Sequence, residues 1–300
     1  MFSKVERKKA KLRMALTGVS GAGKTLSALY IAYGITGDWG KIALIDTEHE
    51  RARFYANRSD LGTGEFLYQS FVPPYSPERY KELVREGAEV VGSDGVVIID
   101  SFSHAWNNEG GVLDIKEQIS QQRGKNSYTA WNEAGKEQNS LVNTILAVDC
   151  HTIVTMRSKM DYVMQENDKG KLEPVKVGLA PVQRDDTEYE FDIVLDIARN
   201  HIATASKDTT FLDKFGKVIT PELGKQLADW LNTGVEPERC ENCHKVIMTD
   251  KIKKTDSPPR LLSVEEIIKT STEKLGKKLC YKCFAIEYRA KKEAEKNAAS

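Results

Sequence analysis

The sequence predicts an α/β protein with a central, mostly parallel sheet, followed by a small cysteine-rich module. Two observations support this prediction. From about residue 12 to residue 235, short apolar runs alternate with amphipathic segments, the pattern of helices that cover a parallel sheet. Beyond that point, four of the five cysteines form two CxxC pairs. We therefore expect a core domain over residues 1–235 and a four-cysteine module with a charged tail over residues 236–300.

Each core element has its own pattern. Apolar residues at helical spacing predict helices on the sheet faces over residues 76–91 and 132–148. A further helix is expected over residues 221–232, because Pro221 suits a first helical turn and Gly234 follows. Within the module, the segment 263–276 is also amphipathic. Short apolar runs predict strands at residues 12–18, 41–46, 95–100, 151–156, 192–198 and 201–205.

The composition excludes two classes of protein. Lysine plus arginine equals aspartate plus glutamate at 44 each, so the chain is not a polycation that binds nucleic acid by bulk charge. No apolar segment approaches the roughly 18 to 20 residues of a membrane span, and the mean hydropathy is -0.47. The 40% hydrophobic content suffices for a packed core. We expect a cytoplasmic protein without membrane contact, in which Cys150 is a core thiol.

Residues 18–25 read GVSGAGKT and match the phosphate-binding loop GxxxxGK[ST]. The match lies between a predicted strand and the helical run LSALYIAYG, which is the context that such a loop requires. Its backbone N–H groups can face phosphate oxygens, Lys24 can neutralise the terminal phosphates, and the Thr25 hydroxyl can ligate Mg²⁺. The candidate ATP-binding residues are Gly18, Val19, Ser20, Gly21, Ala22, Gly23, Lys24 and Thr25.

A second apolar run ends in an acid that suits the same site. The segment GVVIIDS places Asp100 at the end of a predicted strand, and a P-loop enzyme needs an acid to hold the water shell of its Mg²⁺. Many strands end in aspartate, so this signal is weak by itself. Together with the P-loop it predicts that Asp100 belongs to the Mg²⁺ site and that Ser101 supports it by hydrogen bonding.

A third apolar run, KIALIDTEHE, ends in several acids. In a parallel sheet the carboxyl end of the strand next to the P-loop strand faces the γ-phosphate. Glu48 is therefore expected to orient and deprotonate the attacking water. Asp46, Glu48 and Glu50 lie close together, and only one of them would point inward. The alternative is a solvated acidic turn that merely ends the strand.

The three motifs together resemble the RecA/RadA core. IALIDTEHERARFYA is similar to the segment that carries the catalytic glutamate of that family, and GVSGAGKT and VVIIDS flank it in the same order. The similarity covers roughly residues 12–220. It implies a RecA-like P-loop NTPase core with Glu48 as the general base.

Two later segments resemble parts of the same core. HTIVTMRSK is similar to the strand before the DNA-binding loop, which implies that Arg157 lies where the family keeps a polar γ-phosphate sensor. HIATASKDTT is similar to a late strand whose lysine reaches the neighbouring subunit's nucleotide, which implies that role for Lys207. The family often has a second cation shortly afterwards, where this chain has Thr209 and Thr210. Either Arg157 or Lys207 could instead be an ordinary surface cation.

The polar stretch between residues 164 and 192 is too long for a tight turn. The sequence of this stretch and the cysteine-containing tail resemble those of phage-encoded RecA-like ATPases, a group that includes single-strand annealing and recombination proteins. Lys176, Gln183 and Arg184 could meet a DNA backbone, but several acids nearby argue against a simple basic groove. A structural loop that closes the site is the alternative.

Cys240 with Cys243, and Cys280 with Cys283, give the pattern CxxC-x36-CxxC. Four soft ligands without an open position favour a closed structural Zn²⁺ site, and a redox dithiol pair is the alternative. The module is rich in lysines that could contact nucleic acid or form a solvated face. These are Lys245, Lys251, Lys253, Lys254, Lys274, Lys277, Lys278 and Lys282.

These observations support two hypotheses of different classes. In the first, the protein is a Mg²⁺-dependent ATPase that forms a homo-oligomer and acts on single-stranded DNA in phage recombination or replication. In the second, it is a nucleotide-gated oligomeric adaptor whose zinc module binds a protein partner, such as a phage replication or recombination protein, with little hydrolysis. A small-molecule kinase is a third interpretation, but the sequence shows no acceptor pocket or lid for it.

Overall fold

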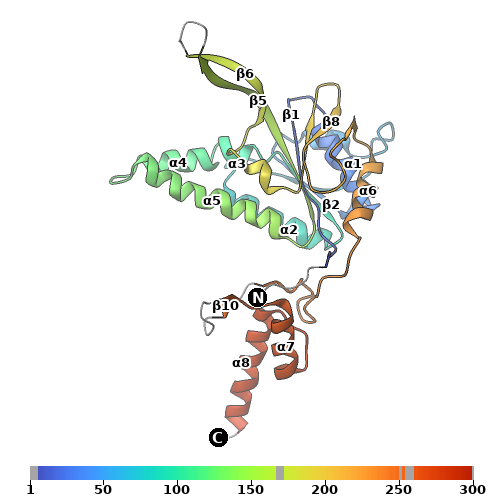
Figure 1. Ribbon diagram of the computed structural model, residues 1–300, viewed down its shortest axis with the longest axis vertical. Coiled ribbons are helices and arrows are strands. Elements are labelled where there is room, and N and C mark those ends of the chain that lie inside the picture. The colour runs from blue at the N-terminus through green and yellow to red at the C-terminus, as the bar shows by residue number, and fades with distance from the viewer. Residues whose placement is uncertain (1–5, 167–171, 250–251, 254–259, 299–300) are drawn as a thin grey trace. The chain divides into compact units, whose positions relative to one another are not determined.

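The structure, a computed structural model, describes residues 6–166, 172–249, 252–253 and 260–298 (Figure 1). The chain divides into two compact units. The larger unit comprises Ala10–Asn232, and the smaller comprises Met1–Lys9 together with Thr233–Ser300.

The larger unit is built on a nine-stranded sheet, which confirms the expected α/β class with a mostly parallel sheet (Figure 1). Apart from β6, which pairs with β5, the strand order is β3-β2-β4-β5-β1-β7-β8-β9. Neighbours from β3 to β7 are parallel, whereas β8 and β9 are antiparallel additions. The strands are β1 Arg13–Gly18, β2 Ile42–Asp46, β3 Leu67–Ser70, β4 Val96–Asp100, β5 His151–Glu166, β6 Leu172–Pro181, β7 Ile193–Ile197, β8 Ile202–Asp208 and β9 Gly216–Val218.

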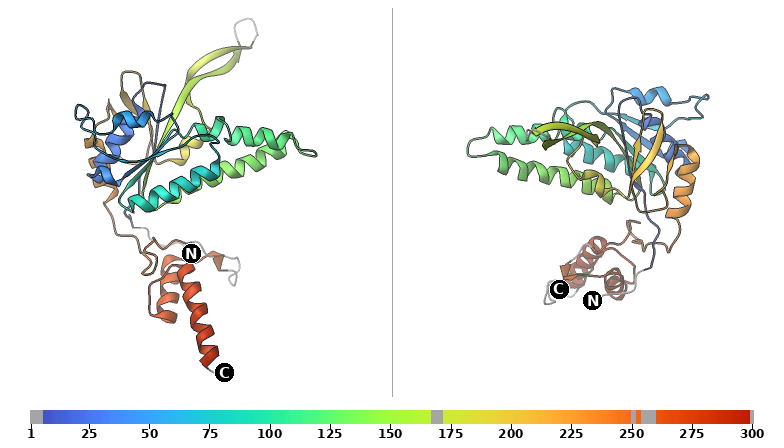
Figure 2. Two further views of the ribbon diagram at one scale, coloured as in Figure 1. Left: turned by 180° about the vertical axis from the view of Figure 1, so that it is seen from behind. Right: turned by 45° about the horizontal axis from the view of Figure 1, so that its top comes forward.

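Helices cover both faces of this sheet (Figure 2). Helices α1 (Lys24–Thr36) and α6 (Pro221–Leu231) pack on one face, and α2 (Pro77–Val91) and α5 (Ser127–Ala147) pack on the other. The central strands are buried on both sides, so β1 sends Met14 and Leu16 into one core and Ala15 into the other. None of the described helices combines the length and apolar character that a membrane crossing requires.

The segment after the expected strand 151–156 differs most from the sequence-based prediction. Strand β5 does not stop there but continues to Glu166 and pairs with β6 in an antiparallel hairpin, from Ser158↔Pro181 to Glu166↔Leu172. The prediction of a long polar loop is therefore wrong, because most of the segment forms two antiparallel strands. Polar residues hid the strand pattern, although the antiparallel ladder satisfies the backbone hydrogen bonds of the segment.

Helices α3 (His104–Asn107) and α4 (Val112–Ser120) were not predicted, and α5 begins before the expected residue 132. Asn126 caps α5, since its side-chain oxygen accepts a 2.9 Å hydrogen bond from the Thr129 backbone N–H. Helices α4 and α5 form an antiparallel pair that extends from the sheet (Figure 2).

The smaller unit has its own hydrophobic core, which includes Cys240, Ile247, Ile267 and Leu279. Helix α7 (Val264–Leu275) confirms the expected amphipathic segment, and Ser263 caps it by accepting from the backbone N–H of Glu266. The charged tail continues as α8 (Tyr281–Ala298). A short ladder pairs β10 (Ile252–Lys253) with β11 (Arg260–Leu261).

Candidate functional site

The P-loop joins β1 to α1, and its backbone requires glycine at both ends. Gly18 has φ 155°, and a Cβ there would lie 2.5 Å from the carbonyl oxygen of Ile197. Gly23 caps α1 in the left-handed region with φ 90°. The first N–H groups of a helix have no partner within it, so those at the start of α1 can donate to phosphate oxygens.

Lys24 lies within the same loop. Its Nζ donates to the carbonyl oxygens of Gly18 at 2.9 Å and Val19 at 3.0 Å. Burial lowers the pKa of Lys24, while the carboxylates of Asp100 and Glu48 oppose that shift. The ammonium group is thus held by two loop carbonyls and interacts with the charges of Asp100 and Glu48.

Asp100 lies directly below the P-loop and is 3% exposed. The Thr25 hydroxyl donates a 2.6 Å hydrogen bond to its Oδ2, and the Thr155 hydroxyl donates to its Oδ1. Burial raises the pKa of Asp100, whereas these two hydrogen bonds oppose the rise. A buried carboxylate beside a hydroxyl is a pair of hard oxygen donors, which fits Mg²⁺.

Ser101 does not support Asp100 in the expected way. Its hydroxyl accepts a 3.2 Å hydrogen bond from the backbone N–H of Ser103, and its own N–H donates to the Thr47 hydroxyl at 2.8 Å. Thr155, which lies on β5 more than fifty residues away in sequence, supplies the second hydrogen bond to Asp100 instead. No local pattern in the sequence marks that threonine.

The topology corrects one premise about Glu48. Strand β2 is not next to the P-loop strand, because β4 and β5 lie between β2 and β1. Glu48 reaches the site since the chain beyond β2 folds over the end of β4. There the N–H of Thr47 donates to the Asp100 carbonyl at 2.7 Å.

Only one of the three clustered acids points into the site. Asp46 is 1% exposed and shapes the turn, since its carboxylate accepts from the N–H groups of Glu48 at 2.6 Å and Ala52 at 3.0 Å. Glu50 is exposed and lies 3.5 Å from the guanidinium of Arg53. The Glu48 side chain is 14% exposed, so a solvated turn does not describe it.

Arg157 holds the carboxylate of Glu48 with two hydrogen bonds, one of them 2.7 Å from Nε to Oε1. Burial raises the pKa of Glu48, but the hydrogen bonds and charge of Arg157 outweigh it and the net pKa is lowered. The imidazole Nε2 of His104 lies 3.8 Å from Oε1 of the same carboxylate. Sequence reasoning placed Glu48 and Arg157 in one site but missed His104.

His201 is a second residue that the sequence did not single out. It lies in the turn between β7 and β8, and its Nδ1 is 3.0 Å from the carbonyl oxygen of Ala22 in the P-loop. A Cβ on Gly23 would lie 3.0 Å from the same nitrogen. The imidazole therefore packs against the start of α1.

Lys207 lies at the other end of the sheet. It is paired with Val194 near the start of β7, whereas the P-loop follows the carboxyl end of the parallel β1. Its Nζ donates to the carbonyl oxygen of Tyr189. Lys207 thus takes no part in the nucleotide site of its own chain, and a role in a neighbouring subunit stays a prediction.

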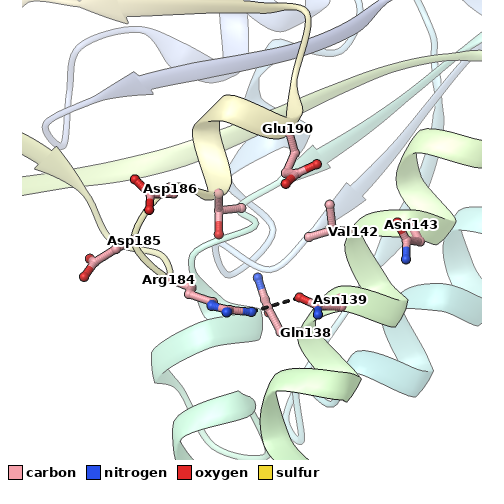
Figure 3. A pocket seen from close by; sticks show the side chains of 9 residues that line it. Gln138, Asn139, Val142, Asn143, Arg184, Asp185, Asp186 and Glu190 are labelled. Atoms are coloured by element: carbon pink, nitrogen blue, oxygen red, sulfur yellow. Dashed lines mark hydrogen bonds between the residues drawn. The ribbon is translucent and has the colours of Figure 1, made fainter. Parts of the chain in front are cut away.

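The segment after β6 lines a polar cavity of about 340 Å³ beside α5 (Figure 3). Arg184 donates to the side-chain oxygen of Asn139 at 2.8 Å, and buried Gln183 accepts from Gln138 at 3.0 Å. These contacts make Gln183 a structural residue. The side chain of Lys176 lies outside the described part of the chain. The lining residues are Gln138, Asn139, Val142, Asn143, Arg184, Asp185, Asp186, Thr187 and Glu190.

In the smaller unit, Cys240, Cys243, Cys280 and Cys283 converge, with their sulfur atoms all within 4.8 Å of one another. The Sγ atoms of Cys243 and Cys280 are 3.8 Å apart. Tetrahedral coordination with Zn–S bonds of about 2.3 Å gives S···S separations of about 3.8 Å. The cluster is therefore compatible with Zn²⁺. Lys251 and Lys254 lie outside the described residues, as does the side chain of Lys253.

A family model described as AAA domain matches residues 10–257. The chain belongs to the AAA domain family. Membership in this family of P-loop ATPases supports the expected binding and hydrolysis of a nucleotide, and implies Mg²⁺. No curated protein matches the chain. In this AAA domain protein, the P-loop, Thr25 and Asp100 form the candidate nucleotide site. The closer resemblance to RecA/RadA proteins and to phage proteins stays a prediction.

Proposed function

We propose that this AAA domain protein is a Mg²⁺-dependent ATPase in which Glu48 is the general base. The observation that carries the proposal is the 2.6 Å hydrogen bond between the Thr25 hydroxyl and the buried Asp100 carboxylate. When bound there, Mg²⁺ would supply charge neutralisation to the β- and γ-phosphates. Thr25 and Asp100 are the residues that would hold it, with Ser101 fixing the backbone below them.

The residues of the chain divide the chemistry between them. The loop N–H groups and Lys24 hold the triphosphate and stabilise the charge that moves onto the leaving oxygen. Glu48 accepts a proton from water while the water oxygen bonds to the γ-phosphorus. As this bond forms, the bond between the γ-phosphorus and the β–γ bridging oxygen breaks. The products are ADP and phosphate, and the proton from water is then on Glu48.

The variant Glu48→Gln tests the base role. It keeps the size of the side chain but cannot accept the proton, so we expect ATP binding to persist and turnover to fall about 10²- to 10⁴-fold. Glu50→Gln is the matched control, because it makes the same chemical change on an exposed side chain two residues further on. Unchanged turnover in Glu48→Gln would reject the assignment.

The proposal extends to a homo-oligomer that acts on single-stranded DNA in phage recombination or replication. The resemblance to RecA-like proteins supports this extension, as does the place of Arg157 at the root of the β5–β6 hairpin. Its carbonyl oxygen accepts a 2.6 Å hydrogen bond from Val182 where the hairpin returns. ATP turnover measured with and without single-stranded DNA, across salt concentrations, tests it, since phosphate contacts weaken with salt.

One observation favours the alternative of a nucleotide-gated adaptor with little hydrolysis. Arg157 donates to both oxygens of Glu48 and lowers the pKa of the carboxylate, which makes it a weaker base. In an adaptor, ATP would hold the oligomer together and the zinc module would bind a protein partner. Tight ATP binding without a DNA response would support the adaptor, whereas salt-sensitive stimulation by DNA would support the ATPase.

A further inference from the structure

His104 is a buried histidine beside the candidate base. It begins α3, four residues after Asp100, and is 2% exposed. Within the described part of the chain, neither Nδ1 nor Nε2 makes a hydrogen bond of standard geometry, although a weaker backbone interaction with Thr47 raises the pKa of the ring. Buried polar atoms are seldom left in this way, and such an atom calls for an explanation.

The ring faces the candidate base. Nε2 lies 3.8 Å from Oε1 of Glu48, which is beyond a hydrogen bond of about 3.2 Å but within a small side-chain movement of one. On its other side the ring packs at a tilt against Tyr75, with centroids 5.2 Å apart. Tyr75 is itself 3% exposed, so the imidazole is supported from behind and directed toward Glu48.

Glu48 therefore has two neighbours that can donate to it. Arg157 donates hydrogen bonds to both oxygens, from Nε and from a terminal nitrogen, whereas the imidazole N–H could donate to Oε1 alone. Burial and the charge of Arg157 lower the pKa of His104, while the charge of Glu48 and the backbone interaction with Thr47 oppose this. The ring is thus suited to donate as a neutral group.

We propose that His104 is a positioning residue for ATP hydrolysis, which takes over one oxygen of Glu48 when Arg157 releases the carboxylate. This inference rests on the proposed ATPase function. With the imidazole N–H on Oε1, the carboxylate keeps a fixed orientation and Oε2 is free to accept the proton of the attacking water. A neutral donor also withdraws less charge than a guanidinium, so the carboxylate is a stronger base in this second arrangement.

The first test compares His104→Phe with His104→Gln. Phenylalanine keeps the packing against Tyr75 but removes the donor, so we expect kcat to fall about 10- to 100-fold with little change in KM for ATP. Glutamine carries an N–H donor and should restore most of the rate. If both variants lose the same activity, or if KM rises and kcat does not fall, His104 is only a packing residue.

The double variant Glu48→Gln, His104→Phe separates this inference from the function on which it rests. Because a positioning residue acts through its partner, adding His104→Phe should not lower the residual rate of Glu48→Gln any further. An additional drop would overturn the inference. A wild-type protein with no ATP turnover would instead reject the proposed function. Wild-type turnover that His104→Phe leaves unchanged would reject this inference alone.

A measurement on the unaltered chain covers the case in which His104→Phe does not fold. The chain has five histidines, which makes ¹⁵N spectra of the imidazoles tractable. Donation to Oε1 requires a proton on Nε2, so we expect the neutral Nε2–H tautomer and a shift of that signal when a slowly hydrolysed ATP analogue binds. A ring protonated only on Nδ1, or a signal that does not respond to the analogue, would contradict the proposal.

Discussion

Replacing Thr155 by valine tests the arrangement below the P-loop, because valine keeps the shape of the side chain and removes only its hydroxyl. Asp100 is 3% exposed, and its two oxygens accept from Thr25 and Thr155. In Thr155→Val, Oδ1 loses its donor in a place that water does not readily reach. A hydrogen bond to a charged group contributes about 1.5 to 3 kcal/mol, so we expect Thr155→Val to lower the free energy of unfolding by that amount at neutral pH.

The pH dependence of this loss has a definite sign. Burial already raises the pKa of Asp100, and the Thr155 hydrogen bond opposes the rise, so Thr155→Val should raise the pKa further. With a raised pKa, the folded state binds the carboxyl proton more tightly than the unfolded state does. The free energy of unfolding is therefore higher at low pH and falls as the pH rises through the folded pKa. The difference in unfolding free energy between Thr155→Val and wild type should therefore shrink as the pH falls.

Mg²⁺ binding needs the ionised carboxylate, so the affinity for Mg²⁺-ATP should fall as the pH is lowered. In Thr155→Val this fall should begin at a higher pH than in the wild type, because the pKa of Asp100 is higher. Fluorescence titration with an ATP analogue at several Mg²⁺ concentrations, combined with urea unfolding, measures both effects. Thr152→Val is the matched control, since Thr152 is equally buried on β5 but contacts Arg13 at 3.3 Å. If both variants bind Mg²⁺-ATP like the wild type, Asp100 does not depend on Thr155.

Three further predictions test other parts of the chain. Arg157→Gln frees Glu48 from a partly exposed ion pair worth about 0.2 to 1 kcal/mol, so DNA-independent ATP turnover should rise about 2- to 5-fold; lower turnover would make Arg157 a phosphate-binding residue instead. A chelator with a colorimetric indicator should release one Zn²⁺ per chain, and Cys243→Ser should abolish that release; zinc retained by Cys243→Ser would contradict the four-thiolate site. Burial lowers the pKa of His151 to about 3, so stability is lost as pH falls below the unfolded value of about 6.5. Urea unfolding at pH 6.5 and pH 5 should differ by about 2 kcal/mol, and His151→Asn should flatten that difference.

What the sequence predicted well depends on residues that are near one another along the chain. The P-loop is a run of eight residues between a strand and a helix, and its glycines are required by backbone geometry at Gly18 and Gly23. Asp100 is the last residue of β4 and Glu48 follows β2 by two residues. The apolar residues of both strands are buried, so each apolar run gives the position of its acid. Periodicity also indicated α2, most of α5 and α7, and Pro221 with Gly234 indicated α6.

What the sequence did not predict depends on pairing between distant segments. The order of the strands cannot be read from apolar runs, so β2 was placed next to the P-loop strand when β4 and β5 lie between them. Thr155 and His104 are ordinary residues in their own segments. The pairing of β4 with β5 brings Thr155 to Asp100, and the pairing of β2 with β4 brings His104 to Glu48. The β5–β6 hairpin was missed for a similar reason, because each strand is stabilised by the other.

Arg157 shows why the order of the strands matters for function. Its N–H donates to the Ser103 hydroxyl at 2.9 Å, its carbonyl accepts from Val182 at 2.6 Å, and its side chain holds Glu48. Since β5 lies between β4 and β1, this single residue joins the segment that carries Asp100, the returning strand of the hairpin and the candidate base. A movement of the hairpin root that displaces the Arg157 backbone can therefore weaken the hydrogen bonds of its side chain to Glu48. His104 stands beside the carboxylate that such a movement would release.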